Sequence, residues 1–367
     1  MRIVILRTGT SDFGKIGSYN VQEVGLATAL IKKGHEVNVI YLNRSVKDIE
    51  QDDVYDFVYY LPHISIGIHG IVDVNLLAKF NPEKLILFSD NQLWAKNIIL
   101  WCKKNNIKCI HYFGNVLSDN KKWLNQFYTK LILKRNIRSY NYSVNVAKTE
   151  KVHQEMNRLK VPFAKVIPVG LDETLLQNCQ NLDLKVRAEL GFGKNEIVLL
   201  FIGRLIDYKK PLLACDILKS LIGKGIDARM VIIGKGVLQE DLLKYIDKQS
   251  LSANIRYIEK VPYKEIYRYM VSSDCLINLS SQEIFGMTIL EAMYYGLPVV
   301  AHTAPGPNEI IEFGENGFLC DSDDVEVWKS LIIKAIESRI DIGRQAKQLV
   351  LDKFVWDKIA DEFLRLL

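Results

Sequence analysis

Short apolar runs alternate with longer stretches of mixed apolar and polar residues along the whole chain. The first run spans residues 2–6, and apolar residues at helical spacing follow at 21–31 before the next run at 35–41. Such short runs are typical of strands buried in a parallel sheet, whereas apolar residues three and four positions apart predict a helix. The whole pattern predicts ten strands, at residues 2–6, 35–41, 84–88, 107–110, 142–146, 197–202, 229–233, 255–258, 275–279 and 299–301.

Two α/β domains are expected because the strands form two series and because 367 residues exceed the usual length of one domain. We predict an N-terminal domain over residues 1–166 and a C-terminal domain over residues 167–349, each a doubly wound sheet, facing each other across a cleft. Residues 350–367 are expected to pack back on the N-terminal domain. Ligands of such sheets bind at the carboxyl ends of the strands.

Composition excludes several classes of protein. A chain with 49% hydrophobic and 25% charged residues is an ordinary globular protein and not a disordered or fibrous one. Its six cysteines contain no C-x-x-C pair, which argues against thiol chemistry and for a reducing compartment. The first apolar run is too short for a signal peptide, and no run of 18 apolar residues is present. We therefore expect a cytoplasmic protein that is neither secreted nor membrane-spanning.

The net charge of +5 is concentrated in one region. Residues 103–151 contain eleven basic and two acidic residues, so they carry +9 and the remainder carries −4. Within this region, residues 121–138 combine cations with apolar residues at helical spacing. Such a helix can lie on an anionic membrane surface, or its apolar stripe can pack into the domain core. No nucleic-acid partner is expected, because no binding module is visible. The stripe consists of Trp123, Leu124, Phe127, Tyr128, Leu131 and Ile132.

The densest group of candidate functional residues follows the strand expected at 275–279. Glu283 lies in the next loop, and a helix is predicted to begin near Gly286. The amides of residues 285–287 would then lie at a helix N-terminus, where backbone N–H groups can bind an anion. Glu291 lies about 7.5 Å further along the helix axis, which suits a diphosphate at the helix start and a ribose beside Glu291. The alternative is that Glu291 is simply a residue of an amphipathic helix.

Glu283 and Glu291 are eight positions apart, and this spacing resembles the E-x7-E signature of family 4 glycosyltransferases, which are retaining enzymes of the GT-B fold. The resemblance extends from about residue 1 to 320 and implies two Rossmann-like domains. Further segments resemble motifs of this family in the same order: residues 17–18 and 34–37, the interdomain segment 166–172, G-R-L-x-x-x-K at 201–210, I-x-G-x-G at 231–236, G-G-x-x-E-I at 304–311 and N-G-x-L at 315–319.

The resemblance implies four catalytic residues, Glu283, Arg204, Lys209 and His111. Arg204 and Lys209 would neutralise the donor's diphosphate, whose negative charge grows as the glycosidic bond breaks. Lys210 is an alternative to Lys209, since the two lysines are adjacent. Glu283 and His111 would contact hydroxyls of the transferred sugar.

The resemblance also implies a set of donor-binding residues. Gly17 would let the acceptor and the donor phosphate approach the first loop. Val261 would lie near the nucleotide base, and Glu291 would accept the ribose hydroxyls. Lys260 departs from the family pattern, which commonly has a glycine at this position. The complete set is Gly17, Gly203, Val261, Phe285, Gly286, Met287, Thr288 and Glu291.

Two other segments resemble sites of different chemistry but lack the required context. Residues 321–323 form a D-x-D sequence like the metal motif of the other large glycosyltransferase fold, but they come late, beside Asp324, and are interpreted as a solvated turn. The glycines at 9, 14 and 17 do not have the G-x-G-x-x-G spacing of an NAD site. We expect no cofactor and no metal, because Arg204, Lys209 and helix amides supply the positive charge.

The sequence is thus interpreted as a retaining glycosyltransferase that moves a sugar from a nucleotide-diphosphate donor, UDP in preference to GDP, to a hydroxyl of a saccharide. A lipid-linked saccharide at the inner face of the cell membrane is the expected acceptor, in surface polysaccharide or glycoconjugate assembly. The alternatives are a sugar-nucleotide 2-epimerase, another GT-B enzyme such as a phosphorylase, and a non-catalytic sugar-nucleotide sensor.

Overall fold

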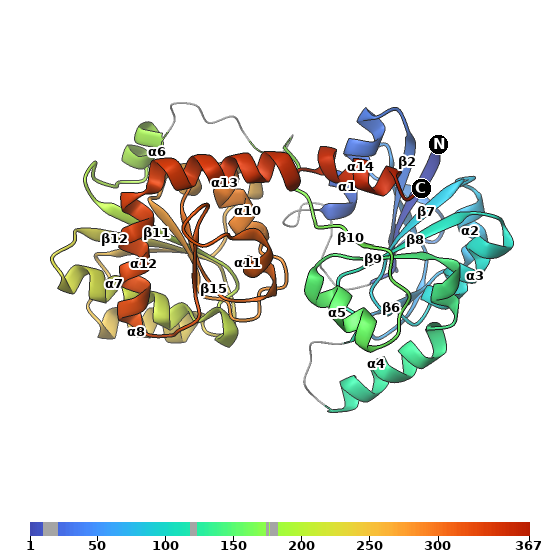
Figure 1. Ribbon diagram of the computed structural model, residues 1–367, viewed down its shortest axis with the longest axis horizontal. Helices are drawn as coiled ribbons and strands as arrows, with labels where there is room; N and C mark the ends of the chain where they lie inside the picture. Colours follow the sequence, from blue (N-terminus) through green and yellow to red (C-terminus); the bar gives the residue numbers. More distant parts are fainter. Residues whose placement is uncertain (10–20, 118–122, 174–175, 177–182) are drawn as a thin grey trace. The chain divides into compact units, whose positions relative to one another are not determined.

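The chain forms two compact units in the computed structural model, which describes residues 1–9, 21–117, 123–173, 176 and 183–367 (Figure 1). The first unit comprises Met1–Gly170 and Val355–Leu367, and the second comprises Leu171–Phe354. The chain therefore passes between units after Gly170 and again after Phe354. The sequence analysis expected these passages after residues 166 and 349.

An eight-stranded sheet forms the centre of the first unit, in the order β10-β9-β8-β7-β1-β2-β4-β3. All neighbouring strands are parallel except β3 and β4. The chain winds from β1 outward to β2 and β4, and later returns to β7, on the other side of β1. The strands are β1 (Arg2–Arg7), β2 (Glu36–Leu42), β3 (Glu50–Gln51), β4 (Val58–Leu61), β7 (Lys84–Phe88), β8 (Lys108–Phe113), β9 (Val144–Ala147) and β10 (Lys165–Val166).

The last helix of the chain packs against the first helix within this unit (Figure 1). A Cβ atom at Gly25 would lie 2.3 Å from Nε1 of Trp356, and one at Gly170 would lie 2.8 Å from the backbone nitrogen of Trp356. Both positions therefore exclude larger residues while Trp356 is in place. The unit's helices and its separate hairpin are α1 (Gln22–Lys32), β5 (Ile64–Ile66), β6 (His69–Ile71), α2 (Val74–Ala78), α3 (Ala95–Lys104), α4 (Trp123–Asn136), α5 (Glu150–Arg158) and α14 (Trp356–Leu364).

The second unit contains a six-stranded parallel sheet in the order β13-β12-β11-β14-β15-β16. The chain winds from β11 to β12 and β13, and then returns to β14 beside β11 and continues outward. Its elements are α6 (Asp183–Glu189), β11 (Ile197–Ile202), α7 (Pro211–Gly223), β12 (Ala228–Ile233), α8 (Gln239–Lys248), β13 (Ile255–Ile258), α9 (Ile266–Ser272), β14 (Cys275–Asn278), α10 (Met287–Tyr294), β15 (Val299–His302), α11 (Pro305–Ile310), β16 (Phe318–Cys320), α12 (Val325–Glu337) and α13 (Arg339–Lys353).

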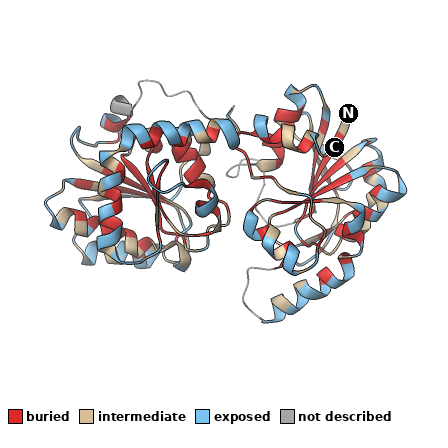
Figure 2. Cartoon of the chain, viewed as in Figure 1, coloured by how far each residue is buried: buried red, intermediate tan, exposed pale blue. Residues whose placement is uncertain are grey.

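The prediction of two α/β domains with doubly wound parallel sheets is confirmed. All ten predicted strands are present, and the central ones are buried on both faces; Ile3, Ile5 and Leu6 of β1, for example, have no exposed surface. Figure 2 shows buried residues along the strands of both sheets. The sequence missed β3, β4, β5, β6, β10 and β16, which have two to four residues each and carry too few apolar positions for a pattern to show.

Candidate active site

The candidate site of the second unit lies between β11 and β14, where the chain changes the direction in which it adds strands to the sheet. The carboxyl ends of β11 and β14 are neighbours there. Gly203 and Arg204 follow β11, and the loop that carries Glu283 follows β14. Open α/β sheets bind their ligands at this position, outside the strand ends at the point of reversal. The fold thus brings residues of two separate sequence motifs to one edge of the sheet.

Lys209 and Glu283 form an ion pair at this edge. The ammonium nitrogen of Lys209 is 2.5 Å from Oε2 of Glu283, and the two side chains are only 16% and 17% exposed. The stem of Lys209 runs past Gly203, where a Cβ atom would lie 3.6 Å from its Cδ. The neighbouring Lys210 has a left-handed backbone (φ 51°), and its ammonium group bonds to Asp323 instead. Of the two adjacent lysines, Lys209 is therefore the one beside Glu283.

Arg204 is exposed at the same edge. Its guanidinium group donates a hydrogen bond to the hydroxyl of Tyr208, at 2.7 Å, and Tyr208 belongs to the 3₁₀ turn Asp207–Lys209. The turn that carries Lys209 therefore also contacts the guanidinium group of Arg204. Two cations of different kind, one a compact ammonium and one a planar guanidinium, therefore lie at this edge of the sheet.

Two glycines allow the loop after β12 to pack against the loop that carries Arg204. A Cβ atom at Gly234 would lie 1.8 Å from the carbonyl oxygen of Gly203, and one at Gly236 would lie 2.3 Å from that of Leu205. The amide of Leu205 donates to the carbonyl of Lys235 at 3.0 Å, so the two loops are joined through their backbones. The I-x-G-x-G motif is therefore a packing requirement of this edge.

Helix α10 begins at Met287, directly after Gly286, which has a left-handed backbone with φ of 94°. Its first amides have no partner within the helix and can bind an anion. The preceding loop is held by Gly306, whose amide donates to the carbonyl of Glu283 at 3.0 Å and whose missing side chain leaves room for Phe285. Met287 and Thr288, both half-buried, form the first turn of the helix.

Glu291 is buried in the second unit, with 1% of its surface exposed. One carboxylate oxygen accepts a hydrogen bond from the hydroxyl of Tyr263, at 3.0 Å. Burial and the charge of Glu291 raise the pKa of Tyr263 well above its ordinary value, so the phenol remains a donor at neutral pH. Glu291 therefore does not lie on a solvent-facing side of its helix. Tyr263 was missed by sequence reasoning, although it lies only two positions beyond Val261, itself half-buried.

His111 belongs to the first unit and has no exposed surface. Its Nε2 atom bonds to the carbonyl of Ser89, and its ring lies 3.8 Å from the ring of Phe113, centroid to centroid. Burial lowers the pKa of His111 to about 4, so the imidazole is neutral at pH 7. Contact with a sugar remains a prediction, and in the described structure the ring offers it no surface. Gly17 lies outside the described residues.

A second group of charged residues lies at the carboxyl ends of the first sheet, and sequence reasoning did not identify it. Arg7 and Glu23 form an ion pair of 2.8 Å, in which Glu23 is 2% exposed. Asp90 accepts hydrogen bonds from the amides of Gly114 and Asn115. Lys148 donates to Gln22 at 3.1 Å, and desolvation lowers the pKa of Lys148. These side chains mainly satisfy one another or nearby backbone.

Acidic residues of the segment after β16 bond to other parts of the second unit. Asp323 is 60% exposed and bonds to Lys210, while Asp324 caps α12 by accepting from the amide of Glu326 at 2.9 Å. Throughout the described part of the chain, no group of three or more His, Cys, Asp or Glu side chains is arranged to hold a metal ion.

Helix α4 of the first unit exposes most of its apolar stripe (Figure 2). The C-terminal half of the helix attaches it to its unit, since Ile132, Leu133 and Asn136 are buried there. The alternative in which the stripe packs into the core is therefore wrong for its other five residues, which are exposed. No described helix is long and apolar enough to cross a membrane. The exposed fractions are 73% for Trp123, 55% for Leu124, 55% for Phe127, 65% for Tyr128 and 48% for Leu131.

Comparison with known proteins agrees with the fold. Residues 184–349 match the family described as glycosyl transferases group 1. An uncharacterized glycosyltransferase of Methanocaldococcus jannaschii is 28% identical over 69% of this chain and 65% of its own length. The UDP-Gal:alpha-D-GlcNAc-diphosphoundecaprenol alpha-1,3-galactosyltransferase of Escherichia coli is 28% identical over 48% of this chain and 46% of its own length. These alignments span less than two thirds of either relative.

Among solved structures, Anabaena HepE in complex with UDP matches 100% of this chain and 99% of its own, with a TM-score of 0.75 and 18% identity. At this identity the likeness establishes the fold alone. Residues 184–349 thus match the glycosyl transferases group 1 family, on a chain whose two units have the GT-B fold.

Proposed function

We propose that this protein transfers a sugar from a nucleotide-diphosphate donor to a hydroxyl of a saccharide acceptor, with retention of the anomeric configuration. The observation that carries the proposal is the Lys209–Glu283 ion pair beside the N-terminus of α10. The buried Glu291 lies on the same helix. We favour UDP as the nucleotide, because HepE was solved with UDP and the Escherichia coli relative is named for UDP-Gal.

Each group in the second unit has a role in this proposal. The ammonium group of Lys209 has three donors, so it can retain Glu283 while it bonds a phosphate oxygen. Arg204 and the first amides of α10 would bind the same diphosphate. Charge-assisted hydrogen bonds of this type contribute about 1.5–3 kcal/mol each. They strengthen as the leaving diphosphate gains charge, which favours the transition state over the bound donor.

The proposed reaction needs no protein nucleophile. The acceptor hydroxyl would attack the anomeric carbon from the face that the diphosphate leaves, through an oxocarbenium-like state. The bond to the diphosphate breaks as the new glycosidic bond forms, and the departing phosphate oxygen takes the acceptor's proton. Glu283 would bind hydroxyls of the transferred sugar, and Glu291 would accept the two ribose hydroxyls. Positive charge from Arg204, Lys209 and helix amides would make a metal ion unnecessary.

We assign donor binding to the second unit and acceptor binding to the first, and we propose a lipid-linked saccharide as the acceptor. The exposed stripe of α4 supports a membrane-facing role, since Lys130, Lys134 and Arg138 are exposed on or just after the same helix. Each such cation contributes about 1 kcal/mol near an anionic surface. Arg135 is used within the protein, where it bonds to the side chain of Asn97. This would place the reaction at the cytoplasmic face of a membrane.

Incubation with a panel of UDP- and GDP-sugars tests the transferase activity. Free nucleotide should be released in step with glycoside formation. Replacement of Glu283, Arg204 or Lys209 by Ala should lower kcat/KM at least 100-fold, because each change removes a group that binds the transition state. The matched control is Lys210→Ala, which should stay within about threefold of wild type because Lys210 faces Asp323.

Other outcomes distinguish the alternatives. An epimerised donor sugar without transfer would indicate an epimerase, and tight binding of the donor without turnover would indicate a sensor. Full activity of Glu283→Ala would show that the site is misplaced.

Flotation with vesicles tests the membrane assignment. The protein should float with vesicles of phosphatidylglycerol and phosphatidylcholine, and less with phosphatidylcholine alone. Phe127→Gln combined with Lys134→Gln should abolish flotation, since the change removes an exposed apolar contact and a cation. The control is Val237→Gln, at an 83% exposed position of the second unit, which should float as wild type does. Flotation that is insensitive to lipid charge would contradict the assignment.

A further inference from the structure

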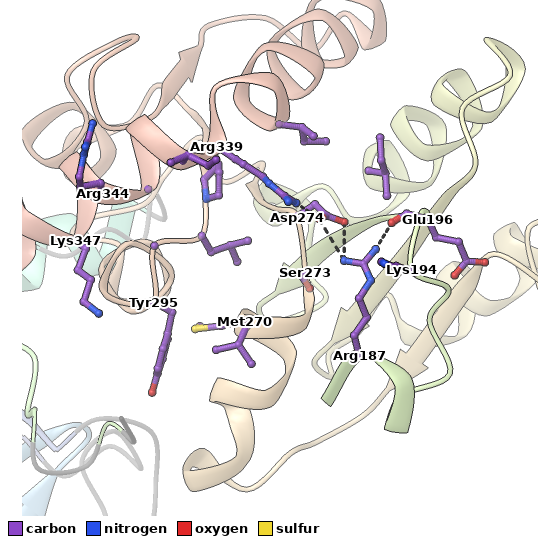
Figure 3. A pocket seen from close by; sticks show the side chains of 18 of the residues that line it. Arg187, Lys194, Glu196, Met270, Ser273, Asp274, Tyr295, Arg339, Arg344 and Lys347 are labelled. Atoms are coloured by element: carbon purple, nitrogen blue, oxygen red, sulfur yellow. Dashed lines mark hydrogen bonds and ion pairs between the residues drawn. The ribbon is translucent and has the colours of Figure 1, made fainter. Parts of the chain in front are cut away.

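A cavity lies at the amino ends of the strands of the second unit's sheet, opposite the carboxyl ends that form the candidate active site. It has a volume of about 880 Å³. Glu196, Asp274 and Pro298 line it, and they immediately precede β11, β14 and β15. In a parallel sheet, residues before the strands and residues after them lie at opposite edges. One face of α13 forms another wall (Figure 3).

Two arginines share one buried carboxylate at this cavity. The guanidinium group of Arg187 bonds to both oxygens of Asp274, at 3.1 and 3.2 Å, and Arg339 approaches the same group at 3.1 Å (Figure 3). Asp274 is 7% exposed, and Arg187 is 11% exposed. Arg339 is 58% exposed and faces solvent. This triad carries one positive charge in excess.

Two lysines add to that excess. Lys194 and Lys347 are exposed, and neither has an ion pair with a carboxylate in the ranges that the structure describes. The ammonium group of Lys347 lies 5.6 Å from the ring centroid of Tyr294. The other charges are compensated: Glu196 pairs with Arg229, and Arg344 pairs with Asp341. The cavity therefore carries about three uncompensated positive charges.

The floor of the cavity is apolar, and part of it also borders a small cavity beside Glu291. Met270 and Tyr295 line this cavity, and both also line the small cavity beside Glu291. In Figure 3, Lys194 and Lys347 lie on opposite sides of the pocket, with Met270 and Tyr295 between them. A volume of this size matches ordinary small-molecule sites. A ligand seated here would touch side chains that border the carboxylate proposed for the ribose.

We propose that this pocket binds a phosphorylated small molecule and that its occupancy alters the affinity of the donor site through Met270 and Tyr295. The phosphate groups of such a molecule carry negative charge, which would compensate the positive charges of Arg339, Lys194 and Lys347. An organic part of the same molecule covers the apolar floor. The binding is independent of the proposed transferase function, whereas the coupling to the donor rests on it.

Titration calorimetry with inorganic tripolyphosphate, in the presence of saturating UDP, tests the binding. UDP occupies the site at Arg204 and Lys209, so one further site per chain should remain. Lys194→Gln combined with Lys347→Gln should weaken tripolyphosphate binding at least tenfold, because two of three uncompensated charges are removed. Lys244→Gln is the matched control on the same unit, where the lysine is 76% exposed and pairs with Glu240, and it should bind as wild type does.

Two results would overturn the binding proposal: no second site in the presence of UDP, or equal affinity in the double variant and the wild type. If UDP does not bind, the choice of UDP as the nucleotide fails, but a tenfold loss in the double variant would still support the pocket. The coupling is measured as the Kd of UDP with and without saturating tripolyphosphate. A shift of twofold or more in the wild type that vanishes in the double variant supports it, and an unchanged Kd contradicts it.

Discussion

The carboxyl ends of the two parallel sheets differ in what occupies them. In the second unit, backbones approach each other closely at Gly234 and Gly306, and Arg204 remains exposed. In the first unit, Glu23 is paired with Arg7, and His111 is buried. One edge is built around close backbone contacts and the exposed guanidinium group of Arg204, and the other around side chains that mainly bond to the protein.

This difference follows from what each edge has to bind in the proposed reaction. A nucleotide diphosphate presents the same phosphates and ribose to every donor site, and amides at a helix N-terminus suit the phosphates. Close approach of backbones requires glycine, and glycine positions are visible in a sequence. An acceptor differs from one enzyme to the next, so its contacts depend on side chains whose partners come from distant segments.

The largest expected effect is at the glycine that joins the two loops of the second unit. Gly234→Ala should lower the free energy of unfolding by about 3–5 kcal/mol, because its φ of 151° suits glycine alone and because a Cβ atom would meet the carbonyl oxygen of Gly203 at 1.8 Å. Urea denaturation followed by circular dichroism measures the loss. A change below about 1 kcal/mol would mean that the loops can separate at little cost.

Gly223→Ala is the control for this measurement. Gly223 ends helix α7, and a Cβ atom there would meet no neighbour within 4 Å. Alanine favours helix over glycine by about 0.5–1 kcal/mol, so this variant should be as stable as the wild type or slightly more so. Comparing the two variants separates the effect of a Cβ atom between two close backbones from the general effect of replacing glycine by alanine.

The sequence predicted the sheets better than the site, for a physical reason. Apolar runs that are buried on both faces mark their strands directly, as in β1 and β11. The choice between Lys209 and Lys210 depended on a left-handed backbone at Lys210, which no local sequence pattern predicts. The contact of Tyr263 with Glu291 joins residues 28 positions apart. The burial of His111 likewise depends on Phe113 and Tyr140 packing around it.

The next effect is a dependence of stability on pH that should be confined largely to the first unit, which contains five of the six histidines. Burial lowers the pKa of His111 to about 4, whereas an unfolded histidine titrates near 6.5. Between these values the unfolded state binds a proton that the folded state does not. Stability from His111 is therefore complete above pH 6.5 and is lost as the pH falls to 4, by about 3 kcal/mol in total.

Urea denaturation at pH 7.5 and pH 5, followed by tryptophan fluorescence, measures this dependence. The signal reports mainly the first unit, which holds four of the five tryptophans, namely Trp94, Trp101, Trp123 and Trp356. His111→Gln should have a smaller difference between the two pH values than the wild type. Burial also lowers the pKa of His35 and His63, so part of the dependence should persist in the variant. An equal difference in both proteins would exclude His111 as its source.

The smallest expected effect concerns helix α4, and here the absence of an effect is informative. Phe127→Gln should change the free energy of unfolding by less than about 0.5 kcal/mol, because the ring is 55% exposed. Leu133→Gln, on the same helix, should cost about 2–4 kcal/mol, since Leu133 is 6% exposed and a buried amide would lack partners. A loss above 1 kcal/mol for Phe127→Gln would mean that the stripe is covered by protein in solution. The helix would then be a packing surface, and the proposed membrane contact would be wrong.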